Sequence, residues 1–262
     1  MLSICVEDVW FRYSGTKNYI LEEFSLKRIE PGTIGILGTN GCGKSTFLKL
    51  IGGIYSPSLG KIRMNKKKLN EIKKTERIIY IPENARLFLI GPTPKKDLNR
   101  IIQDPNQVDK LLYEHQFTHL ANKKLYNLSE GQRRLIAIFN AFQIPSSIII
   151  LDEPTIGLDV KGRELLFYLF EQAKTQGKIV FVASNDPRIF PKLDELVIIR
   201  NGRLLQRGLP EDILYNLEES SELIPNQIPR LIRSLELQLE RNLPRCLTAA
   251  ELNLKLKEGR FL

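Results

Sequence analysis

Apolar and polar residues alternate along the chain with two different periods, and together they predict a mixed α/β protein. The segments SIIIL (147–151) and KIVFVA (178–183) are almost entirely apolar, which is typical of strands buried on both faces. Between them, KGRELLFYLFEQAK (161–174) has the period of an amphipathic helix. Strands that alternate with helices in this way predict a mostly parallel sheet with helices on both faces.

The first 83 residues predict further short strands that are separated by turn residues. These strand-like segments are CVEDVWFRY, YILEEFSLKRI, GTIGIL, GKIRMN and ERIIYI. From Glu83 to about Pro145 the pattern becomes helical, since PTPKKDLNRII (92–102) begins as a helix after a proline and Ser129 precedes an amphipathic run. We therefore expect a helical insertion within the α/β core.

The C-terminal part contains one hairpin signal and several helix signals. The dipeptide Asn201-Gly202 lies between ELVIIR and RLLQRG, and it favours the tight turn of a β-hairpin. From about Pro210 onward the pattern predicts helices separated by Pro225, Pro229 and Pro244.

These elements predict an α/β core at residues 1–208, which combines a mostly parallel sheet with an antiparallel β subdomain. The helical insertion occupies about residues 84–145 of this core. Residues 209–262 are expected to form a C-terminal helical extension.

The composition changes this picture little. With 42% hydrophobic and 26% charged residues, the 262-residue chain has the balance of a globular protein. No apolar run approaches the length needed to span a bilayer, and the start MLSICVEDVW lacks the order of a signal peptide, so we expect a cytosolic chain. Three distant cysteines, Cys5, Cys42 and Cys246, argue against a disulfide framework. The net charge of +9 indicates either attraction to polyanions or an ordinary solvated basic surface.

The segment GTNGCGKST follows a predicted strand and opens a predicted helix, which is the context of a phosphate-binding loop. In such a loop, backbone N–H groups surround phosphate oxygens and the helix N-terminus adds partial positive charge. Lys44 is expected to reach the β- and γ-phosphates, and Ser45 to bind Mg²⁺, so the loop predicts nucleotide binding. The residues expected to bind the nucleotide are Gly38, Thr39, Asn40, Gly41, Cys42, Gly43, Lys44, Ser45 and Thr46.

Cys42 occupies a variable position of this loop. Either the helix N-terminus and a nearby lysine lower its pKa and make the thiol reactive, or the residue is a small spacer. Nucleotide binding that survives alkylation of Cys42 would rule out the reactive thiol.

The segment SIIILDEPTIGLD places two carboxylates at the end of a predicted buried strand, where α/β sheets bind ligands. Asp152 is suited to Mg²⁺ next to Ser45, and Glu153 to polarising an attacking water as a general base. Alternatively, the two acidic residues only cap a helix or face solvent. Next to a phosphate-binding loop, the pair favours ATP hydrolysis, so the core is predicted to be a P-loop ATPase.

Four motifs in this order resemble the ATP-binding-cassette (ABC) ATPases: the phosphate loop, then LSEGQ (128–132), LDEP (151–154) and GLD (157–159). The resemblance extends over residues 3–208. It implies that LSEGQ opens a helix whose N-terminus meets the γ-phosphate of ATP bound by a facing subunit. Glu130 replaces the usual glycine, and its carboxylate weakens that contact unless it points away. Outside the phosphate loop, the nucleotide-contacting residues implied by the resemblance are Ser129, Gly131, Gln132, Asp152 and Asp159.

Three further residues stand at positions that have roles in that family. Tyr13 stands where the family has an aromatic residue that stacks on adenine, although a core position at a strand end is an equal alternative. Asn185 stands where the family has a histidine that contacts the γ-phosphate and fixes the attacking water. Glu83 stands in place of the glutamine that senses Mg²⁺ and the water.

The last two departures predict a site that binds ATP but hydrolyses it poorly. An amide such as Asn185 donates a hydrogen bond, but it carries no positive charge and exchanges no proton near neutral pH. Glu83 can still bind the metal, but it adds negative charge beside the γ-phosphate. The retained Glu153 favours some turnover.

Two more segments resemble the ATPases of energy-coupling-factor transporters, which energise prokaryotic importers of vitamins or transition-metal ions. LFLIGPTPKKDL (87–98) has the LF…PT…DL pattern of those proteins. The tail from GLPEDILYN (208–216) onward is similar to their C-terminal extension, which contributes to ATPase dimerisation, although a generic helical tail is the alternative.

This resemblance implies three partners. A second ABC ATPase subunit would face this chain, and Asn185 and Glu83 favour a heterodimer over a homodimer. A transmembrane coupling protein would dock on the segment after Glu83, and a small membrane protein would capture the substrate. We therefore expect peripheral association with the cytoplasmic face of the cell membrane, where a basic subunit lies near anionic headgroups.

Other functions stay open from the sequence: the ATPase of an exporter or lipid transporter, a soluble ABC protein without transport, and a non-catalytic regulatory subunit. His115 and His119 are spaced as on one face of a helix, which suits either a metal clamp or a partly exposed helical surface. The run NKKKLNEIKK (65–74) lacks interleaved aromatic residues, so it indicates a solvated loop rather than a nucleic-acid site.

Overall fold

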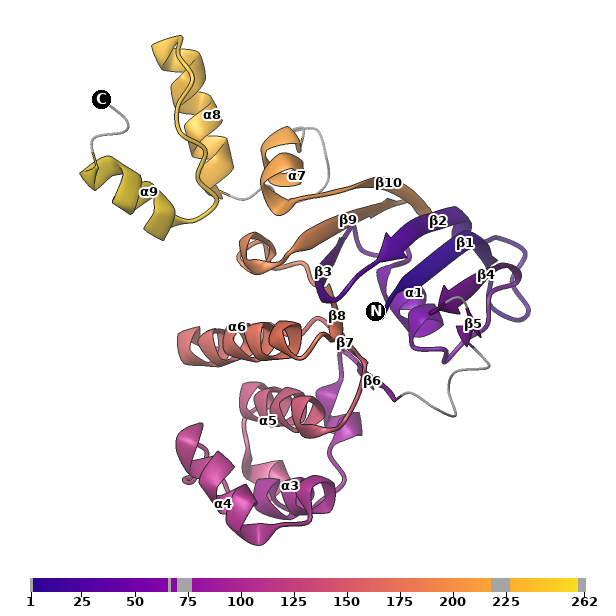
Figure 1. The fold of residues 1–262 in the computed structure, drawn as a ribbon, viewed down its shortest axis with the longest axis vertical. Coiled ribbons are helices and arrows are strands. Elements are labelled where there is room, and N and C mark those ends of the chain that lie inside the picture. Colours follow the sequence, from indigo (N-terminus) through magenta and orange to yellow (C-terminus); the bar gives the residue numbers. More distant parts are fainter. Residues whose placement is uncertain (1, 66, 70–76, 218–226, 259–262) are drawn as a thin grey trace.

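The structure, a computed structural model, describes residues 2–65, 67–69, 77–217 and 227–258, whose strands form two sheets (Figure 1). The smaller sheet is antiparallel, with the strand order β2 (Leu21–Ile29), β1 (Ile4–Phe11), β4 (Leu59–Met64) and β5 (Lys67–Lys68). The larger sheet has the strand order β10 (Arg203–Gly208), β9 (Glu195–Arg200), β3 (Gly32–Leu37), β8 (Ile179–Ala183), β7 (Ile148–Asp152) and β6 (Ile78–Ile81). Its neighbouring strands are parallel except for the hairpin β9–β10, so the predicted combination of sheets is confirmed.

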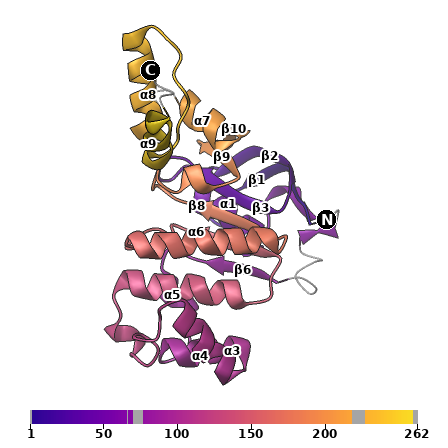
Figure 2. The ribbon, with the colours of Figure 1, turned by 60° about the vertical axis from the view of Figure 1, so that its left-hand side comes forward.

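Helices cover both faces of the larger sheet. The described α-helices are α1 (Lys44–Ile51), α3 (Pro94–Ile102), α4 (Pro105–Glu114), α5 (Glu130–Gln143), α6 (Val160–Thr175), α7 (Pro210–Asn216), α8 (Gln227–Leu239) and α9 (Ala249–Lys257). The described 3₁₀ helices are η1 (Ala85–Phe88), η2 (Leu125–Asn127) and η3 (Phe190–Lys192). α1 lies between the two sheets, whereas α5 and α6 cover the other face of the larger sheet, with α3 and α4 beyond α5 (Figures 1 and 2). None of the helices that the structure describes is long and apolar enough to cross a membrane.

The inner strands of the larger sheet are buried on both faces because alternate residues enter different cores. In β7, Ile149 and Leu151 pack with α5 and α6, whereas Ile148 and Ile150 pack with α1 and the smaller sheet. All four side chains are fully buried. This two-sided burial explains the uninterrupted apolar run of β7, and it fixes the strand end at which the polar residues of the candidate site begin.

The helix starts follow from their cap residues. At α5, the Ser129 hydroxyl accepts from the Gln132 N–H and the Gln132 side chain accepts from the Ser129 N–H, both at 3.1 Å, which is a complete capping box. At α3, Thr93 accepts a hydrogen bond from the Lys96 N–H, and Pro94 takes the first helical position, where no N–H is needed. α5 therefore begins after the Ser129 cap that the sequence predicts, and α3 begins within the predicted segment 92–102, while the bounds of the insertion stay a prediction.

One prediction for the tail is wrong. Pro229 does not separate two helices, because it lies in the first turn of α8. A proline is tolerated there, since the first N–H groups of a helix have no intrahelical acceptor. Pro244 does lie between α8 and α9, as expected, and Pro225 lies outside the described residues.

The placement of His115 and His119 on one helix face is also wrong. α4 ends at Glu114, so His115 is its C-cap residue and His119 lies in the following turn. The His115 ring lies 4.8 Å from the ring of Phe139 and 5.7 Å from that of Tyr168, so it fills space between helices. Within the described ranges, no group of three or more His, Cys, Asp or Glu side chains is arranged to hold a metal ion.

The lysine-rich run at residues 65–74 begins at the edge of the smaller sheet. Lys67–Lys68 form the edge strand β5, and both residues are exposed. Residues 66 and 70–74 lie outside the described residues, so the solvated loop stays a prediction.

The C-terminal helices share a small core with α7. The hydroxyl of Tyr215 donates to the carbonyl oxygen of Cys246 at 2.9 Å and accepts a hydrogen bond from the N–H of the same residue. Both residues are buried together with Ile232 and Leu243. These contacts attach the segment between α8 and α9 to α7, which in turn packs against β9 and β10.

Candidate nucleotide-binding site

The loop at residues 38–46 connects β3 to α1. Gly43 is the N-cap residue of α1, and its φ of 111° belongs to the left-handed region, which glycine adopts without strain. A Cβ at this position would lie only 2.8 Å from a methyl carbon of Leu21. No side chain caps α1, so the positive end of the helix dipole remains available to an anion such as a phosphate group.

Lys44 turns back over this loop from the first position of α1. Its Nζ donates hydrogen bonds to the carbonyl oxygens of Gly38 (2.8 Å) and Thr39 (3.1 Å) and to Oδ1 of Asn185 (3.3 Å). Lys44 is only 7% exposed. The ammonium group is therefore held within the loop, where it can form charge-assisted hydrogen bonds with phosphate oxygens.

Ser45 and Asp152 bring two kinds of oxygen donor together beside the loop. The Ser45 hydroxyl donates to Asp152 Oδ1 at 3.2 Å, and the Tyr80 hydroxyl donates to Asp152 Oδ2 at 3.0 Å. Burial and the neighbouring Asp152 carboxylate raise the pKa of Tyr80, so its proton stays in this hydrogen bond. Hydroxyl and carboxylate oxygens are the ligands that Mg²⁺ prefers, so these residues fit the predicted metal.

Glu153 directly follows β7 and is only 9% exposed. Its Oε2 accepts hydrogen bonds from the Asn185 N–H at 3.1 Å and from the Ser184 hydroxyl at 3.3 Å. Burial raises the pKa of Glu153, although these hydrogen bonds and the Lys44 charge act in the opposite direction. A carboxylate with a raised pKa is a better proton acceptor when it is ionised, which suits a general base.

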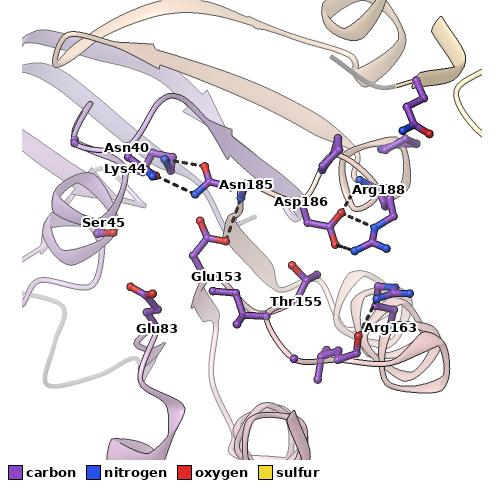
Figure 3. A pocket seen from close by; sticks show the side chains of 18 of the residues that line it. Asn40, Lys44, Ser45, Glu83, Glu153, Thr155, Arg163, Asn185, Asp186 and Arg188 are labelled. Atoms are coloured by element: carbon purple, nitrogen blue, oxygen red, sulfur yellow. Dashed lines mark hydrogen bonds and ion pairs between the residues drawn. The ribbon is translucent and has the colours of Figure 1, made fainter. Parts of the chain in front are cut away.

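Asn185 follows β8 and connects the phosphate loop to the carboxylates (Figure 3). While its backbone N–H binds Glu153, its side-chain Oδ1 accepts from Lys44 and its Nδ2 donates to Asn40 Oδ1 at 3.1 Å. The structure thus brings four predicted residues from three segments into direct contact. The side chain that joins them is neutral.

These residues line a pocket of about 1330 Å³. Glu83 is exposed beyond the end of β6 and lines the same pocket, with its carboxylate pointing toward Glu153 and Ser45 (Figure 3). Of the predicted loop residues, those that line it are Asn40, Gly41, Gly43, Lys44, Ser45 and Thr46. The other three loop residues and Asp152 are not among the residues that line it.

Tyr13 lines the pocket at the side of the smaller sheet. Its hydroxyl shares a hydrogen bond of 2.9 Å with Thr46 Oγ1. Its ring meets Phe11 and Tyr55 edge-on, at centroid distances of 5.2 and 5.6 Å, and packs partly against the core. The two roles predicted for Tyr13, a surface for adenine and a core contact, are therefore compatible.

The far rim of the pocket holds side chains that the motifs do not contain. Arg188 binds the Asp186 carboxylate through Nε at 2.7 Å and Nη2 at 2.9 Å. Burial alone would raise the pKa of Asp186, but the hydrogen bonds from Arg188 lower it overall. Arg163 donates to the carbonyl oxygen of Leu158 at 2.8 Å and also lines this rim. From the C-terminal helices and their connection, the lining residues are Gln227, Ile228, Leu247, Thr248 and Ala249.

The structure favours the spacer role for Cys42 over the reactive thiol. Cys42 is 6% exposed, and burial raises the pKa of its thiol although Lys44 acts in the opposite direction. A Cβ added to Gly38 would lie 2.3 Å from the Cys42 Sγ, so the thiol fills the space beside that glycine.

The phosphate loop and the residues that meet it correspond to a known family. The ABC transporter family profile matches residues 21–156, which is more than half of the chain. The chain belongs to the ABC transporter family. Its fold is accordingly that of an ABC ATPase, and the predicted P-loop ATPase core is confirmed.

Relatives of this ABC ATPase include transporter subunits of similar length. It is 27% identical over 235 residues to the energy-coupling factor transporter ATP-binding protein of Methanocaldococcus jannaschii, covering 83% of each chain. It is 25% identical to the cobalt import ATP-binding protein of Salmonella typhi, covering 98% of each. Among solved structures, cbiO1 from Clostridium perfringens, part of an ABC transporter complex, has a TM-score of 0.70 at 26% identity and covers 91% of this chain and 96% of its own.

In this ABC ATPase, the other predicted nucleotide contacts lie apart from the phosphate loop. Ser129, Gly131, Gln132 and Asp159 line a second pocket of about 1210 Å³. Ser129 and Gln132 form the capping box of α5, and Asp159 caps α6 by accepting from the Gly162 N–H at 2.7 Å. Their contact with nucleotide bound by a facing subunit stays a prediction.

The start of α5 packs closely against the turn that follows the carboxylate pair. A Cβ on Gly131 would lie 2.0 Å from the carbonyl oxygen of Gly157, so contact within the chain already requires glycine at residue 131. The Glu130 carboxylate turns back along the helix to Arg134, with Oε1 3.3 Å from Nη2. It therefore points away from the N-terminus of α5, which is the condition for leaving an anion contact there undisturbed.

Sequence reasoning missed Arg134 and Tyr80, although both contact the carboxylate segment. Arg134 shares its helix face with Ala137, Ile138 and Ala141, so a charge within an apolar stripe was a usable signal. Tyr80 lies in the edge strand β6, where an aromatic residue is ordinary and gives no such signal.

Proposed function

We propose that this chain is the ATP-binding and ATP-hydrolysing subunit of a membrane importer of the energy-coupling-factor type, which takes up vitamins or transition-metal ions. The observation that carries this proposal is the extent of similarity to the cobalt import ATP-binding protein, which covers 98% of this chain and so includes the C-terminal helices. The similarity to an energy-coupling factor ATP-binding protein supports it. In this proposal, residues 1–208 are the ATPase domain, with its helical subdomain at about 84–145, and residues 209–262 contribute to dimerisation.

Binding of ATP is assigned to the phosphate loop and the pocket around it. The N–H groups at the start of α1 and the Lys44 ammonium bind the β- and γ-phosphates. The ring of Tyr13 stacks on the adenine. Ser45 and Asp152, with Glu83 as a further oxygen donor, would hold Mg²⁺, which when bound neutralises charge on the phosphate oxygens.

Hydrolysis is assigned to Glu153, with help from Asn185. The Glu153 carboxylate accepts a proton from the water that attacks the γ-phosphate, and its hydrogen bonds from Asn185 and Ser184 keep it oriented. Asn185 can orient the water or the γ-phosphate by hydrogen bonding alone, because its amide is neutral.

The proposed site is weakened by its charges. Asn185 supplies no positive charge near the γ-phosphate, and Glu83 adds a negative one. Electrostatic stabilisation of the developing charge is a large part of phosphoryl transfer, so the site binds ATP but turns it over slowly.

The partner in this proposal is a second ABC ATPase, and a heterodimer is favoured because a second subunit can supply a fully equipped site. The pocket that contains Ser129 and Gly131 is separate from this chain's own phosphate loop, which supports a role for these residues at the partner's nucleotide. The N-terminus of α5 has the partial positive charge of a helix start, as α1 does, although Ser129 and Gln132 already cap it.

A transmembrane coupling protein is proposed to dock on the segment that follows Glu83. Leu87 and Ile90 are 74% and 73% exposed there, although both are large and apolar. A small membrane protein captures the substrate, and the net charge of +9 favours a peripheral position at the cytoplasmic face of an anionic membrane. No role for nucleic acid is proposed.

The experiment that tests this function is purification of the tagged chain from its native membranes in mild detergent, followed by identification of the proteins that accompany it. We expect a transmembrane protein and a second ABC ATPase. If that ATPase has histidine and glutamine at the positions of Asn185 and Glu83, an asymmetric importer is supported. Recovery of the chain alone, or with partners that lack membrane spans, would contradict the transport function.

A further inference from the structure

Arg134 is a buried arginine in α5, five residues after Ser129, and it is only 3% exposed. Its guanidinium reaches away from its own helix to two other segments. Nη2 donates to the carbonyl oxygen of Glu83 at 2.6 Å, and Nη1 donates to the carbonyl oxygen of Glu153. A single side chain therefore contacts both acidic residues that line the nucleotide pocket from the ends of β6 and β7.

The surroundings of this guanidinium do not suggest a purely structural charge. Its acidic neighbour Glu130, on the same helix, has a side chain that is 70% exposed, and such a screened pair contributes little to stability. Nε of Arg134 is buried and has no hydrogen-bond partner among the described residues. Burying an arginine with an unsatisfied nitrogen costs free energy, and an apolar side chain on this face of α5 would avoid that cost.

The contact with Glu153 acts on a backbone that needs support. Glu153 has a φ of 51°, in the left-handed region that non-glycine residues rarely adopt. Its N–H donates to the carbonyl oxygen of Ala183 at 2.8 Å, and its carbonyl oxygen accepts from Arg134, so both polar groups of this residue are fixed. Loss of either contact would remove one of the two hydrogen bonds that hold this residue's backbone in place.

The contact with Glu83 attaches a second segment to the same group. α5 begins at the capping box of Ser129, whereas Glu83 and Glu153 follow separate strands of the sheet. Any displacement of α5 relative to the sheet therefore acts on both acidic residues through one rigid, planar guanidinium.

We propose that Arg134 is a positioning residue for ATP hydrolysis, which holds the backbone of Glu153 and Glu83 so that the Glu153 carboxylate faces the γ-phosphate and Glu83 stays at the place of the proposed Mg²⁺ ligand. This inference rests on the proposed function, because it assigns Arg134 a role at that site. It also links α5, whose N-terminal residues line the second pocket, to the backbone of this chain's own base.

The test compares Arg134→Lys and Arg134→Gln with a matched control, Arg133→Gln, in the full chain and in the assembly in which it purifies. Arg133 is the neighbouring arginine of α5, and its Nη1 makes only a 3.4 Å hydrogen bond to the carbonyl oxygen of Leu125. For each variant, ATP affinity at equilibrium, kcat and Tm are measured. The same variants are also made in a Glu153→Gln background. The turnover that Glu153→Gln loses relative to wild type is the part of ATP hydrolysis that occurs at this chain's own site.

We expect both Arg134 variants to lower the kcat of this site by about tenfold, because small displacements of a catalytic group have large effects on rate. The ATP affinity should stay within about twofold, and Arg133→Gln should change neither quantity by more than that. In the Glu153→Gln background, the Arg134 variants should have no further effect, because residues that act as one unit are not additive. Arg134→Lys should not retain the wild-type rate, since the lysine ammonium cannot reproduce the two guanidinium hydrogen bonds to the carbonyl oxygens of Glu83 and Glu153.

Four results would overturn the inference: an unchanged kcat, a loss of ATP affinity in parallel with kcat, an equal loss in the Glu153→Gln background, or wild-type turnover that matches Glu153→Gln. If neither Arg134 variant folds, the residue serves the fold and the inference is also wrong. A wild-type chain that binds no ATP refutes the proposed function itself, which separates that failure from the others.

Discussion

The Nζ of Lys44 donates a hydrogen bond to Oδ1 of Asn185 at 3.3 Å, so a neutral amide closes the side of the phosphate loop that faces the carboxylates. The same amide binds Asn40, and its backbone binds Glu153. Asn185 is thus well placed to align the loop with the proposed base. What it lacks is charge.

Restoring charge at the pocket should speed up hydrolysis. In the double variant Asn185→His with Glu83→Gln, a positive imidazolium becomes available near the γ-phosphate and one negative charge is removed, so kcat should rise by about tenfold or more. Steady-state ATP hydrolysis by the purified assembly measures this, with the two single variants as controls. A double variant that is no faster than wild type would show that these residues do not limit turnover.

Removing the loop lysine should weaken ATP binding. Lys44→Ala eliminates charge-assisted hydrogen bonds to phosphate, so we expect the Kd for ATP to rise by at least about tenfold. The control is Lys49→Ala in the last turn of the same helix, which should leave the Kd unchanged. Equilibrium binding of a fluorescent ATP analogue, with competition by ATP, distinguishes the two variants. If Lys44→Ala and Lys49→Ala bind ATP with equal affinity, the phosphate loop is not part of the ATP-binding site.

The raised pKa of Glu153 predicts a stability that depends on pH. Between the ordinary pKa of a glutamate and the raised pKa of Glu153, the folded state keeps a proton that the unfolded state has released, so the free energy of unfolding falls as pH rises through this window. Glu153→Gln has no such proton to release, so its free energy of unfolding does not fall in this window. Its Tm should therefore exceed that of wild type by a few degrees near neutral pH, and the difference should vanish as pH falls below the window.

Thermal unfolding without nucleotide, recorded over a pH series, checks this prediction. The exposed Glu171 on α6 provides the control, and Glu171→Gln should follow the wild-type pH profile. A Glu153→Gln variant that is less stable than wild type near neutral pH would mean that the carboxylate gains more from its hydrogen bonds than burial costs it.

Much of this fold could be predicted because local sequence and tertiary contacts agree. The runs that form β7 and β8 are apolar throughout because each strand is covered on both faces, and the loop at residues 38–46 has glycine where its backbone needs it. The caps at Ser129 and Thr93 act within three residues, so their effect is visible in the sequence alone.

The contacts that could not be predicted join residues that are close in space but far apart in the sequence. Arg134 meets Glu83 and Glu153 from 51 and 19 residues away, and no local pattern contains that information. The helical periodicity of the sequence continues past Glu114 although the helix ends there, so the pattern places His115 wrongly. Such errors concentrate where a chain leaves regular structure and tertiary contacts decide its path.

The burial of Cys42 predicts slow thiol chemistry. Since burial raises the pKa of this thiol, little thiolate is present near neutral pH, and iodoacetamide should modify Cys42 at least about tenfold more slowly than the partly exposed Cys5. Peptide mass spectrometry over a time course measures both rates, and labelling in denaturant provides the control. Cys42 labelling as fast as Cys5 would restore the reactive-thiol interpretation.

The hydrogen bonds between Tyr215 and Cys246 predict that one substitution can destabilise the C-terminal helices locally without disturbing the ATPase core. Tyr215→Phe keeps the ring but removes the hydroxyl, so the N–H and carbonyl groups of Cys246 lose their partner within the small C-terminal core. Leaving such groups unsatisfied costs about 1–3 kcal/mol. We expect faster proteolysis and faster hydrogen exchange in α8 and α9, while protection of β7 and β8 stays the same.

The matched control is Tyr113→Phe, because the Tyr113 side chain is 78% exposed and removal of its hydroxyl should leave the digestion pattern unchanged. Since residues 247–249 line the nucleotide pocket beside the segment that Tyr215 holds, the released helices should also change how ATP protects this region from proteolysis. If Tyr215→Phe and Tyr113→Phe are digested alike, the hydrogen bonds to Cys246 do not hold the C-terminal helices. Their attachment would then depend on apolar contacts such as those of Ile232 and Leu243.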